Sequence, residues 1–272
     1  MLRRVISNLR RQDWMAVAIE LVIVILGVFI GIQVSNWNQA RADVQLGQDY
    51  AKRLARDLDT NLAGVRAESA YYSAVLQSVR KTDALLREPD SDPRELVVNA
   101  YRATEILYNA PVRATWDQIV SSGHLGLLPA RAVESGLSQY FAFDTAQDLY
   151  KTGRASDYRK TVREIIPLDM QIAMHKTCSD VRDRHGYIVG FVERCQFEGD
   201  PAALKTVAAA LRGNPGVAAS LRYQYSFVVN ATTNVGRLKS NLEDALGALG
   251  ARPQFTATAA PAAARAVVAT RR

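Results

Sequence analysis

Four residues between positions 175 and 195 have side chains that bind metals or form disulfides: His175, Cys178, His185 and Cys195. A tetrahedral zinc site uses such a Cys₂His₂ set, but the spacing here matches no zinc pattern that we can justify. Cys178 and Cys195 are the only cysteines of the chain. Outside the cytoplasm two such cysteines are expected to pair. We therefore favour a disulfide, and leave two free thiols or a metal site open as alternatives.

The other chemically active side chains fit no catalytic pattern. His124 could act as a base, but no serine or cysteine nucleophile lies in a recognisable elbow near it. Asp180 and Asp183 resemble the start of a calcium loop, yet Arg182 and Arg184 take positions that need oxygen ligands. The sequence has no P-loop, no GxGxxG and no HExxH motif. We therefore name no catalytic, cofactor-binding or metal-binding residue and expect no enzyme activity and no cofactor, with a cell-envelope enzyme as the less favoured alternative.

A single acid, Glu20, lies within an apolar run from Met15 to Val34. Twenty helical residues span about 30 Å, the thickness of the hydrocarbon core of a bilayer. Trp14 and Trp37 flank the run and are expected to be anchors at the two membrane interfaces. The sequence therefore predicts a transmembrane helix over residues 15–35, with the lipid bilayer as its first partner.

Small and polar residues share one face of this predicted helix. At 100° per residue, Glu20, Val24, Gly27 and Gly31 point in similar directions. Gly27 and Gly31 form a GxxxG motif, which lets two helix backbones approach closely. One interpretation is that this face associates with a second copy or another membrane protein, with Glu20 hydrogen-bonded across the interface. The other is that Glu20 reaches the cytoplasmic headgroups and the glycines are incidental.

The net charge of +7 is concentrated at the two ends of the chain. Residues 1–14 hold one acid and four arginines, and residues 251–272 hold four arginines and no acid, so the body is neutral. A neutral body lacks the clustered charge of a nucleic-acid groove. The positive-inside rule predicts a cytoplasmic N-terminus at 1–14 and an extracytoplasmic domain at 36–250. The N-terminal arginines are Arg3, Arg4, Arg10 and Arg11.

A cleavable signal peptide is the competing interpretation of the N-terminus. Leu21–Ile32 would be its apolar region, and Ala40 and Ala42 fit the small-residue cleavage pattern loosely. The whole apolar run is too long for a signal peptide, and no break separates it from the following helical pattern, so we favour a retained anchor. Fourteen residues before the anchor are too few for an output domain. Any signal is therefore expected to pass through a partner or through the anchor itself.

The rest of the chain is patterned as a mainly α-helical bundle. Apolar residues recur at helical spacing from Tyr50 to Leu86, and a matching stripe covers about Pro215–Leu249, so the two helices are expected to pack antiparallel. A small β or irregular insert is expected around 177–200, and a disordered Ala/Pro/Arg tail at 251–272. Further helices are predicted near 93–109, 113–122, 130–151, 157–174 (with Pro167 kinking or interrupting it) and 201–212.

Two stretches resemble a family of uncharacterised bacterial single-pass membrane proteins, classified as a domain of unknown function. The first is the anchor with Glu20 early in it, leaving through Gln33-Val34-Ser35-Asn36-Trp37-Asn38. The second runs from Trp116 to Leu128 and contains Ser122-Gly123 followed by Leu127-Leu128. The resemblance implies a bacterial inner-membrane protein with an external, periplasmic helical domain, and implies no activity. From the residues we expect a scaffold, assembly or accessory protein acting by protein interaction, with an extracytoplasmic ligand sensor as the alternative. The small-molecule ligand stays unknown.

Overall fold

The computed structural model describes residues 14–178 and 180–253. The N-terminal arginines, and the predicted tail beyond residue 253, lie outside the described residues. The predicted mainly α-helical fold class is confirmed. The chain divides into two compact units, with the boundary between Ala51 and Lys52. The helices are α2 (Trp14–Arg87), α3 (Pro93–Arg102), α4 (Ala114–Ser121), α5 (Ala130–Ala132), α6 (Ser138–Ala142), α7 (Thr145–Arg154), α8 (Asp157–Ile165), α9 (Leu168–Thr177), α10 (Pro201–Gly213) and α11 (Pro215–Ala248).

The first unit is the N-terminal part of α2. Within the described residues, α2 is the one helix long and apolar enough to cross a membrane, by length and composition. No proline or positive-φ glycine interrupts α2, so the apolar stretch runs without a break into the amphipathic one, as the sequence predicts. In the second unit α2 buries Leu54, Leu58 and Leu62 at intervals of four residues, which is the spacing of one helix face.

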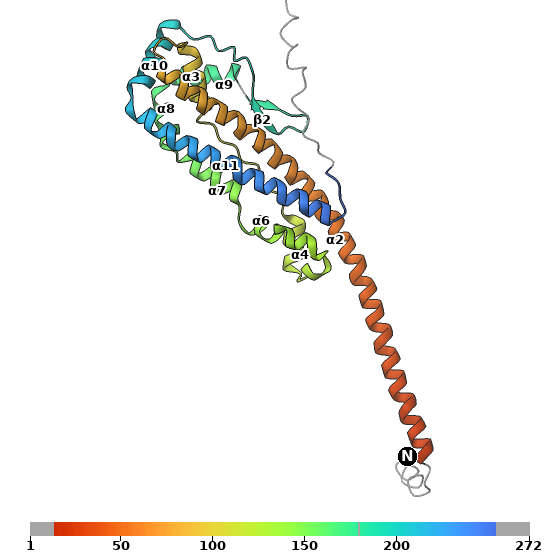
Figure 1. Cartoon of the computed structure of the whole chain (residues 1–272). Coiled ribbons are helices and arrows are strands. Elements are labelled where there is room, and N and C mark those ends of the chain that lie inside the picture. Colours follow the sequence, from red (N-terminus) through yellow and green to blue (C-terminus); the bar gives the residue numbers. More distant parts are fainter. Residues whose placement is uncertain (1–13, 179, 254–272) are drawn as a thin grey trace, which may run out of the picture. The chain divides into compact units, whose positions relative to one another are not determined.

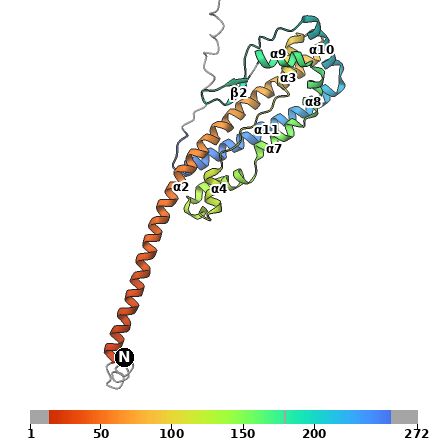
Figure 2. The ribbon, with the colours of Figure 1, turned by 180° about the vertical axis from the view of Figure 1, so that it is seen from behind.

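The second unit is closed by α11, which lies beside the later part of α2 (Figures 1 and 2). Arg66 of α2 forms an ion pair with Glu243 of α11 at 2.7 Å. Further along α2, the guanidinium of Arg80 lies 6.0 Å from the ring centroid of Tyr225. Residue numbers rise on one helix as they fall on the other, so the pair is antiparallel, as expected from the two apolar stripes.

Two of the predicted helix lengths are wrong. The helix expected to reach Asn109 ends at Arg102, because side chains from other helices bind the carbonyls that follow. The helix expected over 130–151 is divided into α5, a π-helical turn η2 (Val133–Leu137), α6 and α7. Gly136 has φ +91° inside that turn. Asp144 begins α7 by accepting a hydrogen bond from the Gln147 amide at 2.9 Å.

Other predicted boundaries agree closely with the structure. Asp92 caps α3, whose first residue is Pro93. Gly123 follows α4 with φ +71°, the left-handed conformation that ends helices. Pro167 separates α8 from α9. The insert is an antiparallel hairpin of β1 (Asp180–Arg182) and β2 (Ile188–Phe191).

The segment between α3 and α4 is irregular, and side chains of α2 satisfy much of its backbone. Backbone polar groups without a partner are costly when buried, so a segment without its own helix or strand needs donors and acceptors from elsewhere. The donors and acceptors come from one side of α2. Tyr72 Oη donates to Leu107 O (3.0 Å), and Glu68 accepts from Asn109 N (2.5 Å). Asn61 bonds both N and O of Val112 (2.7 and 3.0 Å). At the start of α4, Asp57 accepts from Thr115 N (3.2 Å).

Candidate functional site

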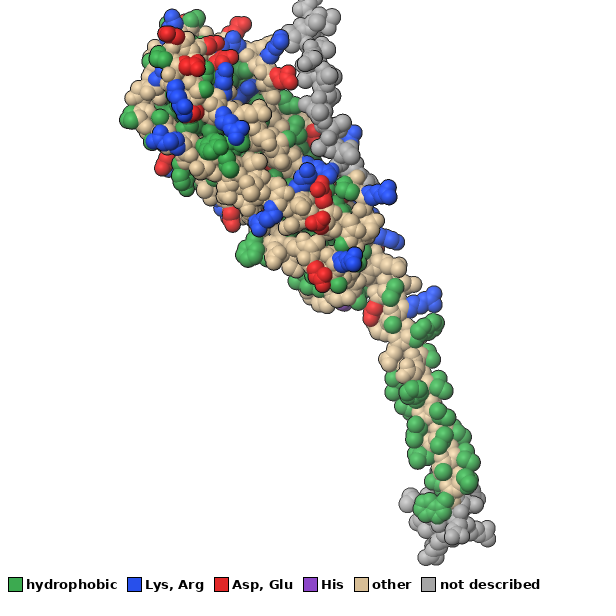
Figure 3. All heavy atoms as spheres, viewed as in Figure 1, with side chains coloured by type: hydrophobic (Ala, Val, Ile, Leu, Met, Phe, Trp, Pro, Cys, Tyr) green, Lys and Arg blue, Asp and Glu red, His purple; other side chains and the backbone are tan. Residues whose placement is uncertain are grey.

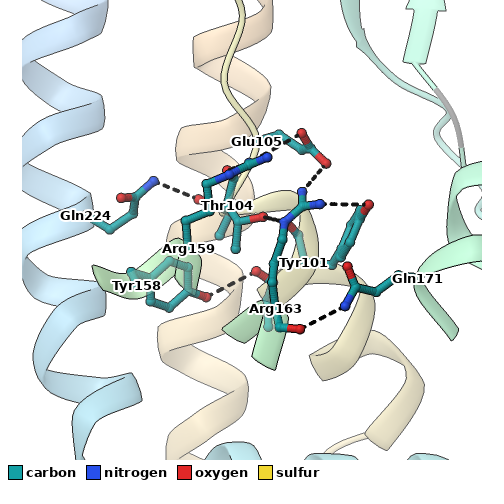
Figure 4. Close-up of polar contacts among 10 residues, drawn as sticks. Tyr101, Thr104, Glu105, Tyr158, Arg159, Arg163, Gln171 and Gln224 are labelled. Carbon is teal, nitrogen blue, oxygen red and sulfur yellow. Dashed lines mark hydrogen bonds and ion pairs between the residues drawn. The ribbon is translucent and has the colours of Figure 1, made fainter. Parts of the chain in front are cut away.

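A polar cluster surrounds the C-terminal end of α3 (Figure 4). The last carbonyls of a helix have no partner within the helix. Here α8 and α11 supply the donors: Tyr158 Oη donates to Ala100 O at 3.2 Å, and Gln224 Nε2 donates to Ala103 O at 2.9 Å. Thr104 O, just beyond the helix, accepts from Arg159 at 2.5 Å. The end of α3 is therefore fixed by helices that come much later in the sequence.

Arg163 of α8 is the centre of this cluster. Its guanidinium donates to Thr104 Oγ1 at 3.0 Å, to the hydroxyl of Tyr101 at 3.1 Å and to Glu105 Oε1 at 2.6 Å. The same guanidinium lies 4.2 Å from the centroid of the Tyr101 ring. Gln171 of α9 donates to the backbone carbonyl of Arg163 at 2.8 Å. These contacts hold the Tyr101 and Glu105 side chains in place.

A small pocket of about 110 Å³ lies beside this cluster, between α3, the end of α9 and the hairpin. Its walls carry both apolar and ionisable groups, and Cys178 also contributes to them. Drug-sized ligands need pockets of roughly 300 Å³ or more, so this one suits a much smaller molecule. The polar and aromatic lining residues are Tyr101, Arg102, Glu105, His175, Asp180 and Phe191.

Two carboxyl groups line the pocket, those of Glu105 and Asp180. Burial raises the pKa of Asp180, and the negative charge of Glu105 raises it further. A hydrogen bond with Tyr71 and the charges of Arg182 and His175 act in the other direction. The pocket therefore brings together a carboxyl group from the segment just after α3 and one from β1.

Arg102 supplies the positive charge on the α3 wall, and it is already engaged. Its Nη2 donates to the carbonyl of Val192 at 2.8 Å, and its guanidinium lies 5.1 Å from the centroid of Phe191. Burial lowers the pKa of Arg102, and the charge of Asp180 opposes that change. The side chain therefore links α3 to the hairpin and closes one side of the pocket.

The two cysteines are joined as a disulfide at the edge of the pocket. Cys178 caps the end of α9, and its Cα lies 4.5 Å from that of Cys195. Arg94 of α3 donates to the carbonyl of Cys195 at 2.8 Å. Of the two histidines considered as metal ligands, His175 lies at the pocket, and His185 lies in the hairpin turn, where its Nε2 accepts from Arg184. Among the described residues no group of three or more His, Cys, Asp or Glu side chains could hold a metal ion.

The predicted association face lies on one side of the first unit's helix. Steps of four, three and four residues separate Glu20, Val24, Gly27 and Gly31, and each of them is exposed. A Cβ added at either glycine would have no atom within 4 Å, apart from the helix itself. Figure 3 shows hydrophobic side chains covering this part of α2.

The predicted interface anchors are also exposed on that helix. The exposed fraction is 67% for Trp14 and 63% for Trp37. The guanidinium of Arg41 lies 5.9 Å from the Trp37 ring centroid. A cation beside an indole ring suits the polar boundary of a bilayer, where both groups are commonly found.

The buried carboxyl group of Glu68 was not predicted from the sequence. Only 1% of it is exposed, and burial raises its pKa to about 7. The Asn109 amide hydrogen bond lowers the pKa and the charge of Asp144 raises it, both by less. One signal was available: the apolar stripe skips from Val65 to Tyr72, and Glu68 lies on that face in the gap.

The pocket residues carried no such signal. Tyr101, Arg102 and Glu105 fall in a stretch that the sequence predicts as an ordinary helix, and their partners are far away in the chain. Comparison with models of known protein families, with curated proteins and with solved structures found no match to this chain. The conclusions on function therefore rest on the residues themselves and on the structure.

Proposed function

We propose that this chain is a bacterial inner-membrane protein that acts by protein–protein interaction, as a scaffold, assembly or accessory component. The observation that carries the proposal is the apolar start of α2, whose residues are exposed on every side and include the Glu20, Gly27 and Gly31 face. In a bilayer, small residues allow close backbone packing and a polar side chain can hydrogen-bond across the interface. The anchor is then both the membrane attachment and the site of association.

The proposed orientation places residues 1–14 in the cytoplasm and the second unit in the periplasm. The N-terminal arginines support it through the positive-inside rule. The Cys178–Cys195 disulfide is of the kind that persists in oxidising compartments. The unbroken helix after the apolar stretch supports a retained anchor over a cleaved signal peptide. The resemblance in the Asn36-Trp37-Asn38 exit supports a bacterial source.

The first test is crosslinking and affinity recovery of the intact protein from its native membrane. Recovery of defined membrane partners supports the proposal, and recovery of the chain alone limits the interaction to self-association. A reporter fused after Gly250 that is active only in the cytoplasm tests the orientation. Activity of that reporter would overturn the periplasmic placement.

The second test compares opposite faces of the anchor. Gly27→Leu should weaken crosslinking between anchors, because its side chain blocks close packing. Ala18→Leu adds the same side chain about 180° away around the helix and should leave crosslinking unchanged. Glu20→Gln keeps hydrogen-bonding capacity and should retain association, whereas Glu20→Leu should reduce it. Equal effects of Gly27→Leu and Ala18→Leu would rule out the proposed face.

The alternative function is an extracytoplasmic ligand sensor. It is favoured by the pocket between α3, α9 and the hairpin, where ionisable groups from three elements converge. An association that changes with a bound small molecule would support the sensor. An association that is the same with and without such a molecule favours the scaffold.

A further inference from the structure

We infer that the pocket between α3, α9 and the hairpin binds the ammonium group of a small aliphatic amine or amino acid. The inference rests on the alternative function above, the ligand sensor. Its test needs only the purified chain, so its failure leaves the proposed membrane interaction untouched.

The two carboxylates have unused hydrogen-bonding capacity. An ionised carboxylate offers about four acceptor positions. Contacts from the described residues use only some of them: Arg163 and Arg159 contact Glu105 at 2.6 and 3.9 Å, and Tyr71 bonds Asp180. Acceptor positions therefore remain on both carboxylates. An ammonium group, with three donors, is the ligand chemistry that matches them.

The two guanidinium groups beside the pocket are already engaged. The Arg102 guanidinium bonds the Val192 carbonyl and covers the Phe191 ring, and Arg163 is bonded to Glu105. A simple anion would have to displace these contacts and would face two carboxylates. A cation would be attracted by both carboxylates; the raised pKa of Asp180 comes first from burial and second from the negative charge of Glu105.

The size of the pocket and its apolar walls favour a short ligand. An engineered cavity of about 150 Å³ holds benzene, which has six non-hydrogen atoms. The pocket has a volume of about 110 Å³, which in proportion suits about four such atoms, and Val98 and Met174 contribute apolar surface to it. A short alkyl chain suits that surface. A carboxylate on the same ligand would meet His175, which faces the pocket and is exposed.

Asp180 is the residue to change. It lies at the exposed end of β1, so Asp180→Asn removes a charge without disturbing the buried cluster around Arg163. Asp148→Asn is the matched control, since Asp148 lies on α7, is largely exposed and does not line the pocket. Glu105→Gln is a second variant, with the circular dichroism spectrum reporting whether the fold is kept.

The experiment uses the full-length chain in lipid nanodiscs and four three-carbon probes: propylamine, alanine, propionate and 1-propanol. Binding is measured by ligand-detected NMR, with dissociation constants expected between about 10 µM and 10 mM for ligands this small. Propylamine, alanine or both should bind, and propionate and 1-propanol should not. Tighter binding of alanine than of propylamine would assign a carboxylate contact as well.

The variants decide whether binding occurs at this pocket. Asp180→Asn should weaken propylamine or alanine binding at least tenfold, because a hydrogen bond to a charged group is lost. Asp148→Asn should leave the dissociation constant unchanged. The inference is overturned if neither ammonium compound binds, if propionate binds as well as they do, or if Asp180→Asn binds them as tightly as the natural chain.

Discussion

The side chain of Asn61 on α2 bonds both backbone groups of Val112, as a neighbouring strand would. Asn61 Nδ2 donates to Val112 O at 3.0 Å, and Asn61 Oδ1 accepts from Val112 N at 2.7 Å. Only 5% of Asn61 is exposed, so water does not readily replace it. The pair joins the irregular segment before α4 to the central helix.

Loss of the two hydrogen bonds between Asn61 and Val112 should destabilise the second unit. Asn61→Ala leaves a partly buried N–H and C=O without partners, and we expect it to lower the free energy of unfolding by about 2–3 kcal/mol. The measurement is urea unfolding of the full-length protein in detergent, followed by circular dichroism. Asn234→Ala, at a partly exposed position on α11 where the side chain bonds its helix neighbours Asn230 and Arg237, should change it by less than about 0.5 kcal/mol. Equal effects would mean that the Val112 contacts contribute little.

The raised pKa of Glu68 predicts that the free energy of unfolding falls as pH rises. Its pKa is raised to about 7 in the folded chain from 4.5, so the folded state holds its proton more tightly than the unfolded state. Stability from this group is fully present below pH 4.5 and is lost as pH rises through 7. Each pH unit in that window costs up to about 1.4 kcal/mol, for a total of about 3 kcal/mol.

The variant Glu68→Gln should remove this dependence. Glutamine keeps an acceptor for the Asn109 amide and carries no charge, so the variant should be more stable than the natural chain at pH 8 and similar at pH 4. Unfolding curves at both pH values measure the difference. Glu88→Gln, at an exposed position after α2, serves as the control. A natural chain that is equally stable at pH 5 and pH 8 would argue against a buried neutral Glu68.

Arg163 should not tolerate lysine. Lysine keeps the charge, but a single ammonium cannot reproduce the planar fork that contacts Thr104, Tyr101 and Glu105. We expect Arg163→Lys to destabilise the second unit by about 2–3 kcal/mol. Arg237→Lys, on the exposed side of α11, should be nearly neutral. Matching melting temperatures for the two variants would contradict the role given to Arg163.

The disulfide should protect the hairpin. Replacing Cys178 and Cys195 together by serine removes a crosslink between residues that are 17 positions apart. We expect the free energy of unfolding to fall by about 3 kcal/mol. Amide hydrogen exchange should then accelerate first in β1 and β2. In the natural chain, maleimide labelling under denaturing conditions should require prior reduction. Full labelling without reductant would show that the thiols are free in the cell.

Two glycines offer a matched comparison of packing. A Cβ at Gly153 would lie 2.6 Å from Ile106 Cγ2 and 2.9 Å from Phe227 Cζ, so Gly153→Ala should destabilise by about 1–3 kcal/mol. Gly236, on α11, has nothing within 4 Å of the added atom. Gly236→Ala should stabilise the helix by about 0.5–1 kcal/mol. Thermal unfolding should therefore move in opposite directions for the two variants.

The long helices could be predicted from the sequence because their determinants are local. The apolar period on α2 and α11, the Asp92 cap and Gly123 act within a few residues of where they stand. The same is true of Pro167, and of the β-branched run that became β2. These features do not depend on which other helix is packed against them.

The pocket and the irregular segment could not be predicted, because their determinants are distant in the chain. The end of α3 depends on Arg159, Arg163 and Gln224, which lie 55 or more positions away. A helical pattern through Asn109 gives no sign that these side chains bind polar groups of the residues after Arg102. Single-sequence periodicity also does not distinguish Glu68 on a buried face from an acid on a solvated one.

The bonds from α2 to the irregular segment reach its backbone and do not touch the side chains of Leu107 and Val112. A deep mutational scan should therefore show very different tolerance to substitution at Val112 and at Asn61. Val112, whose side chain is 38% exposed, should accept almost any residue except proline, which lacks the N–H. Asn61 should accept almost none, because its amide is the only side chain that offers a donor and an acceptor at that reach. In evolutionary terms, this contact is recorded in the sequence of α2 at Asn61, while position 112 is free to vary.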